Sequence, residues 1–135
     1  MNVIGLYLAS PYLFRFISKY IQLDTDLTKI NEGPEDGKRL FRKLGTCSRT
    51  LLYILNREFG HQKELEERAA DSLAGGIMQK GHQCGMLWGS SLALGTEAFR
   101  KCGDHIQAIR VAINATQKIM ESFSNRENTI SCREI

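Results

Sequence analysis

The chain has 135 residues, of which 42% are hydrophobic and 24% are charged, and its net charge is +3. This length favours one globular unit, and the composition excludes a disordered or collagen-like chain. Lysines and arginines alternate with acids along the sequence, so there is no basic stripe of the kind that nucleic acid binding requires.

The first 33 residues predict an aromatic helix followed by a linker. Apolar side chains recur at helical spacing from Tyr12 to Leu23, and Ser10 and Pro11 suit a helix start. Only two cations flank this apolar face, which favours a core or homodimer helix over a membrane-surface helix. The apolar stretch 3–14 lacks a basic leader and is shorter than the ~20 residues that span a bilayer. We therefore expect a cytoplasmic protein without a transmembrane segment.

Residues 34–135 predict the cysteine-containing helical domain. The whole chain is expected to be an all-α, compact bundle of four to five helices, since no stretch of useful length alternates with period two. The first helix of this domain is predicted from Pro34 to Phe59, with Cys47 in the middle of its apolar stripe. A short helix from Leu65 to Ala74 follows.

A glycine-rich loop, residues 75–83, precedes the central helix, which begins near Cys84. Asp104 is predicted to cap the last long helix, whose expected buried stripe is Ile106, Ile109, Ile113, Met120 and Phe123. In the central helix Gly85, Gly89 and Ala93 recur at every fourth position. Glycine costs a helix ~1 kcal/mol relative to alanine, so this face indicates the close approach of another group, either a neighbouring helix or a cofactor.

The loop glycines Gly75 and Gly76 join Gly85 and Gly89 as candidate cofactor contacts. Glycine permits both unusual backbone angles and close approach of a bound group. A helix face of small residues is more commonly explained by helix packing, so both interpretations stay open here.

The four cysteines are Cys47, Cys84, Cys102 and Cys132, and none belongs to a CxxC pair. This spacing excludes a thioredoxin-like motif and covalent haem attachment. Cys84 is the best candidate for chemistry, because a thiol at a helix start has a lowered pKa. Lys80 and His82 precede it and are candidates for additional positive charge. Cys102 is interpreted as incidental.

Three sequence blocks resemble a family of redox-active proteins named for the cysteine pattern C…GCAxxG…C…C. The blocks are the helix containing Cys47, the segment from Ala74 through Cys84-Gly85 to Gly95, and the segment from Phe123 to Cys132-Arg133-Glu134. The resemblance covers residues 37–135. Met86 replaces the usual alanine. The family has a fourth cysteine downstream of Cys-Arg-Glu, and this sequence has no counterpart of it before Ile135. Three explanations stay open: the cysteine is lost, the chain is shortened, or Cys102 has taken over its role.

The resemblance implies redox chemistry at Cys47, Cys84 and Cys132, and the redox activity of the family is itself inferred from its cysteines. The leading hypothesis is a thiol-based redox protein in which Cys84 attacks a disulfide or an electrophile and Cys47 or Cys132 resolves the product. This chemistry needs only two thiols and no cofactor, and its redox partner is unidentified. The alternative is an electron carrier holding zinc or an iron–sulfur cluster through these cysteines, with His82 or Cys102 as a fourth ligand. A third hypothesis is a non-catalytic helical module that forms a homodimer. The sequence leaves open whether the protein is an enzyme.

Overall fold

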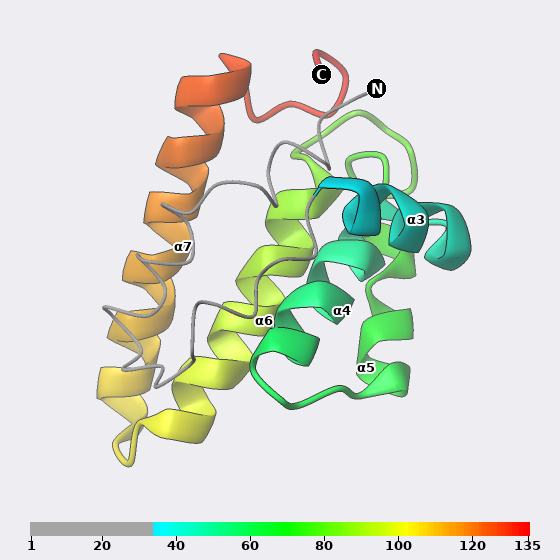
Figure 1. Ribbon diagram of the computed structural model, residues 1–135. Helices are drawn as coiled ribbons and strands as arrows, with labels where there is room; N and C mark the ends of the chain where they lie inside the picture. Colours follow the sequence, from blue (N-terminus) through cyan, green and yellow to red (C-terminus); the bar gives the residue numbers. More distant parts are fainter. Residues whose placement is uncertain (1–33) are drawn as a thin grey trace.

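The computed structural model describes residues 34–135. The predicted aromatic helix and its linker, residues 1–33, lie outside the described residues. The described part consists of α-helices joined by turns (Figure 1), and its sole β pairing is an isolated bridge between Gln83 and Ser131. The elements are α3 (Pro34–Leu44), α4 (Cys47–Glu58), α5 (Glu64–Ala69), the short 3₁₀ helix η2 (Asp71–Leu73), α6 (Gly85–Lys101) and α7 (His105–Glu127). The all-α prediction is confirmed.

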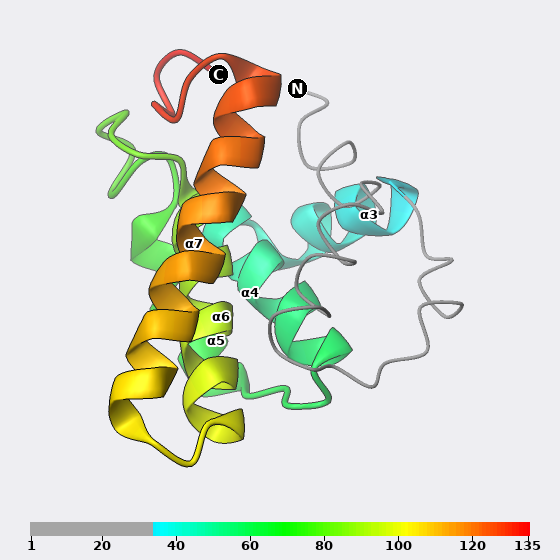
Figure 2. The same cartoon turned by 90° about the vertical axis from the view of Figure 1, so that its left-hand side faces the viewer.

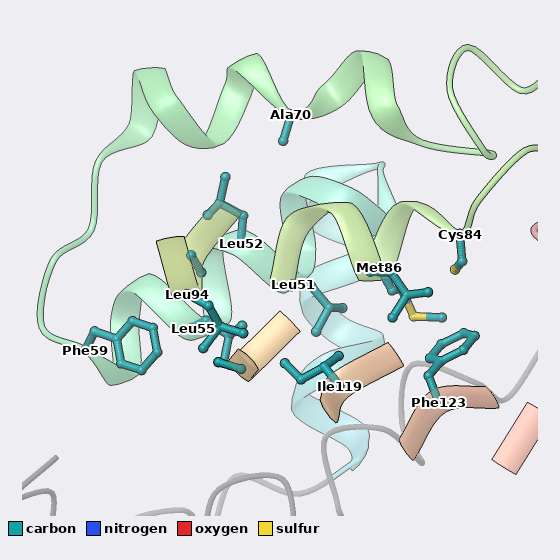
Figure 3. Packing of buried hydrophobic residues seen from close by; sticks show 13 residues of the cluster. Leu51, Leu52, Leu55, Phe59, Ala70, Cys84, Met86, Leu94, Ile119 and Phe123 are labelled. Atoms are coloured by element: carbon teal, nitrogen blue, oxygen red, sulfur yellow. The ribbon is translucent and has the colours of Figure 1, made fainter. Parts of the chain in front are cut away.

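Helix α6 occupies the middle of the bundle, between α4 and α7, with α3 and α5 on the far side of α4 (Figures 1 and 2). The chain reverses between α6 and α7, so these two helices are antiparallel. The core forms where α4, α6 and α7 meet (Figure 3). Its largest fully buried apolar side chains are Leu51, Leu55, Leu87, Leu94, Ile119 and Phe123.

The single helix predicted from Pro34 to Phe59 is wrong, because it is two helices that meet at Gly45. The amide of Gly45 donates a hydrogen bond to the carbonyl of Phe41 (2.8 Å), and its φ of +86° ends α3. Glycine adopts this left-handed conformation without steric cost. Thr46 is then extended, and α4 begins at Cys47. Cys47 is therefore the first residue of a helix and not a mid-helix core residue.

The small-residue face of α6 is covered by α4. A Cβ atom at Gly89 would lie 2.1 Å from the carbonyl oxygen of Ser48 and 3.2 Å from the amide nitrogen of Leu52. Only glycine at position 89 allows the two backbones to approach this closely. The neighbouring helix is therefore the group that this glycine pattern accommodates.

Helix α7 is capped as predicted, because the carboxylate of Asp104 accepts a hydrogen bond of 2.7 Å from the amide of Gln107. The predicted buried stripe is wrong in its first half. Ile106 and Ile113 are each 60% exposed, and Ile109 is also exposed. The residues of α7 that are buried are Ala108, Ala115, Ile119 and Phe123. Small alanines let α7 lie close to α6, so the helix turns this face inward and leaves the isoleucines outside.

Within residues 34–135, no helix has both the length and the apolar composition needed to cross a bilayer.

Candidate functional site: a cluster of three cysteines

Three of the four cysteines come together at one end of the bundle. Cys47 opens α4, Cys84 immediately precedes α6, and Cys132 lies on the segment that follows α7. A Cβ atom at Gly85 would lie only 2.7 Å from Cys47 Sγ, which places the Cys47 sulfur beside the residue that follows Cys84. The charges of Cys47 and Cys132 both raise the pKa of Cys84, and that of Cys47 also raises the pKa of Cys132. Each thiol is thus within electrostatic reach of the others.

Cys47 owes its position to the break between α3 and α4. Thr46 is the N-cap residue, but its side chain makes no capping hydrogen bond to the helix. Its hydroxyl donates instead to Asp71 Oδ1 of η2 (2.6 Å), and Arg49 lies 3.8 Å from the other oxygen of Asp71. The first turn of α4 therefore presents N–H groups and the positive end of the helix dipole around Cys47.

Cys84 is the buried member of the cluster, with 3% of its surface exposed. It is the N-cap residue of α6, and its amide donates a hydrogen bond to the carbonyl of Ile130 (2.8 Å). Burial raises its pKa to about 11, which outweighs the opposite influence of the backbone N–H groups of Met86 and Leu87. The prediction that Cys84 has a lowered pKa is wrong, because desolvation of the thiolate exceeds the stabilisation by the helix start.

Cys132 is held in place by backbone pairing between the last residues and the segment before α6. Asn128 turns the chain out of α7 with a φ of +59°. The Gln83–Ser131 bridge follows, and the Cys132 amide donates to the carbonyl of His82 (2.6 Å). Cys132 is half-buried, and its pKa is raised by burial and by the charge of Cys47. This pairing fixes a residue 48 positions away from Cys84 in sequence.

The glycine-rich loop packs against itself and against the last residues of the chain. A Cβ atom at Gly75 would lie 2.8 Å from Gln79 Cα, and one at Gly76 would lie 2.4 Å from the backbone nitrogen of His82. Five consecutive residues, 75–79, have positive φ angles. The space beside Gly75 and Gly76 is thus filled by the loop. The space beside Gly89 is filled by α4, and the space beside Gly85 is filled by Cys47 of α4 together with Leu73 and Ala74. These four candidate cofactor contacts are accounted for by contacts within the protein.

Metal ligation requires donor atoms that converge on one point. Within the described part of the chain, no three side chains among His, Cys, Asp and Glu are placed to hold a metal ion. His82 is exposed, and its contact with the cluster is through its backbone carbonyl. The imidazole is therefore not brought to the three sulfurs as a fourth ligand.

Cys102 lies outside the cluster. It is the C-cap residue of α6, at the opposite end of the helix from Cys84. The 17 residues of α6 separate the two cysteines by ~26 Å at 1.5 Å per residue. The structure therefore excludes Cys102 as the replacement for a fourth cysteine of this site.

Two features of the site escaped the sequence interpretation. The position of Cys47 at a helix start was missed, although Gly45 and Thr46 together are a usual helix stop followed by a helix cap. The pairing of residues 82–84 with residues 130–132 was also missed. No local pattern indicates a single bridge between segments this far apart.

Comparison with known families gives one match. The family model described as "Putative redox-active protein (C_GCAxxG_C_C)" matches residues 46–135. The match starts at the N-cap of α4, nine residues after residue 37, where the resemblance to the family begins. It contains Cys47, Cys84 and Cys132. Searches of curated proteins and of solved structures found no match.

Proposed function

The chain belongs to the C_GCAxxG_C_C family of redox-active proteins, and from this premise we propose that it is a thiol-based redox protein. It cycles between a dithiol and a disulfide formed within the group Cys47, Cys84 and Cys132. The observation that supports this proposal most strongly is that three thiols from separate parts of the chain lie near one another at one end of the bundle.

Thiol–disulfide exchange requires one thiolate to reach the sulfur of another cysteine, with Cα atoms about 4.4–6.8 Å apart in the product. The Cys47 sulfur lies against Gly85, whose Cα is ~3.8 Å from that of Cys84. The Cys47 sulfur therefore lies beside the residue that follows Cys84, and the charge of Cys47 acts on Cys84. Cys132 is half-buried beside the same pair, so the cluster holds one thiol more than a single disulfide uses.

We place this reaction in the cytoplasm, where thiols are kept reduced and a disulfide is a transient product of turnover. The electrons that restore the dithiol would come from a redox partner carrying its own thiol pair or from a small thiol. Within residues 34–135 the reaction needs no bound metal or organic group, since both sulfurs of the exchange belong to the chain.

The proposal is tested by equilibrating the protein in glutathione buffers of graded redox potential and mapping the disulfide by peptide mass spectrometry. We expect one two-electron transition with a disulfide inside the cluster. Replacement of both Cys47 and Cys84 by serine should remove this transition, because it leaves a single thiol in the cluster. Cys102→Ser is the matched control and should leave the midpoint unchanged. A transition that persists in the double variant, or that disappears in Cys102→Ser, would contradict the proposal.

A further inference from the structure

We infer that Cys47 is the attacking thiol of the cluster and Cys84 the resolving thiol, and that Gly85 leaves the space that the Cys47 sulfur occupies. This inference rests on the proposed thiol–disulfide chemistry and assigns an order to it. It reverses the order that the sequence favoured, in which Cys84 attacks.

Access favours Cys47 as the thiol that meets an incoming disulfide. Attack on a disulfide needs room for the partner's two sulfurs and the attacking sulfur to line up. Cys84 is 3% exposed and lies beside Met86 and Phe123 at the edge of the core (Figure 3). Cys47 is half-buried at the start of α4, so it can be approached without opening the core.

The helix start gives Cys47 the better electrostatic surroundings. It is the first residue of a 12-residue helix whose N-cap side chain is turned away to Asp71. The N–H groups of the first turn and the positive end of the helix dipole are directed toward this position. The other accessible thiol, Cys132, follows a turn and a bridge, and both burial and the charge of Cys47 raise its pKa.

The reaction then proceeds in two exchanges. In the first, the Cys47 thiolate attacks one sulfur of a small disulfide RSSR, forms Cys47–S–S–R and releases RS⁻, which takes up a proton from water. In the second, the Cys84 thiolate attacks the Cys47 sulfur, forms the Cys47–Cys84 disulfide and releases the second RS⁻. The protein loses two electrons and two protons, and RSSR becomes two RSH.

The first exchange prepares the second. Burial is the main cause of the raised pKa of Cys84, and of the two neighbouring thiols Cys47 adds the larger effect through its charge. A mixed disulfide on Cys47 carries no such charge. The backbone N–H groups of Met86 and Leu87, which favour the Cys84 thiolate, remain in place. Cys84 therefore becomes easier to deprotonate once Cys47 has reacted.

Gly85 positions this pair. Besides the 2.7 Å approach to Cys47 Sγ, a Cβ atom at residue 85 would lie 3.0 Å from the carbonyl oxygen of Leu73 and 3.1 Å from Ala74 Cα. The backbone of Leu73 and Ala74 prevents a methyl group at residue 85 from moving away in that direction, so the methyl group would displace the Cys47 sulfur. The side-chain hydrogen at Gly85 thus keeps the attacking sulfur next to the resolving thiol.

The test is to expose reduced protein to oxidised glutathione and locate glutathione on each cysteine by peptide mass spectrometry. Cys84→Ser should accumulate glutathione on Cys47, because the second exchange is removed. The wild type, Cys132→Ser and Cys102→Ser should instead proceed to the Cys47–Cys84 disulfide. Three results would overturn the assigned order. They are glutathione on Cys132 in Cys84→Ser, the absence of any adduct in that variant while the wild type still oxidises, and accumulation of the adduct in Cys132→Ser. A wild type that forms no cluster disulfide would defeat the thiol–disulfide proposal itself.

The role of Gly85 is tested by timing the two exchanges separately. Gly85→Ala should slow the release of the second glutathione at least tenfold while attachment to Cys47 still occurs. Gly95→Ala is the matched control on the same helix, since nothing lies within 4 Å of a Cβ at residue 95. Equal second-step rates in the two variants would overturn the positioning role. The positioning role would also be overturned if Gly85→Ala lost thermal stability but kept the ratio of the two rates unchanged. That result is expected of a residue that only supports the fold.

Discussion

A methyl group at Gly89, near the start of α6, would lie 2.1 Å from a backbone oxygen of α4, whereas one at Gly95 would meet nothing within 4 Å. Helix α7 repeats this difference, because it buries Ile119 and Phe123 and exposes Ile106 and Ile113. Ala98 and Ala108, on either side of the turn before Asp104, are also fully buried. The difference is therefore one between the inward and the outward faces of these helices.

Packing also distinguishes the clustered cysteines from Cys102. Tight packing desolvates Cys84 and brings Cys47 and Cys132 within electrostatic reach of it. Cys102 caps the opposite end of α6, away from these three cysteines. The surroundings of a thiol in this bundle therefore depend on the segments packed beside it.

The largest effect is expected from adding one methyl group where α4 and α6 touch. Gly89→Ala should lower the free energy of unfolding by roughly 4 kcal/mol or more, because the obstructing atom is a backbone oxygen that cannot turn aside. Urea unfolding followed by circular dichroism measures this. Gly95→Ala should leave stability unchanged or raise it by up to about 1 kcal/mol, since alanine is the better helix former. Equal stabilities of the two variants would mean that the helices are not in close contact at Gly89.

A smaller difference is expected between two isoleucines of α7. Ile119 is 1% exposed, and Ile119→Ala should cost about 3 kcal/mol because it leaves a cavity between α6 and α7. Ile113 is 60% exposed, and Ile113→Ala should change the free energy of unfolding by less than ~0.5 kcal/mol. Thermal or urea unfolding of both variants makes the comparison. A larger loss in Ile113→Ala than in Ile119→Ala would show that the inward face of α7 is assigned wrongly.

The smallest of these effects is a pH dependence that belongs to the cysteine end alone. The pKa of Cys84 rises from 9.0 to about 11 on folding, so between these values the folded state holds the proton that the unfolded state has lost. This contribution to stability is complete below pH 9 and disappears as pH rises to 11, up to about 2–3 kcal/mol at 1.36 kcal/mol per unit. Over this range, unfolding free energy should fall further in the wild type than in Cys84→Ala. Cys102→Ala should retain the wild-type slope, and parallel slopes in all three proteins would refute the burial of Cys84.

The helical fold could be predicted from the spacing of apolar residues, and the cap at Asp104 from its place before a helix. Each of these signals is contained within a few neighbouring residues. The buried face of α7 could not be predicted. Ile106, Ile109 and Ile113 form a more hydrophobic stripe than the residues that are in fact buried, which are Ala108, Ala115, Ile119 and Phe123. What decides the face is the close fit of alanines against α6, and this depends on the partner helix. The site shows the same limit. The resemblance to the family identified the three cysteines, but the raised pKa of Cys84 depends on burial, which overrides the helix-start argument.

The central claim is that packing at one end of α6 sets the order of reactivity of the cysteines. The most direct test is a short pulse of iodoacetamide on the reduced protein at pH 8, with the extent of alkylation measured for each cysteine by peptide mass spectrometry. We expect Cys47 to be alkylated first within the cluster, Cys132 next and Cys84 last. Alkylation of Cys84 before Cys47 would contradict the central claim.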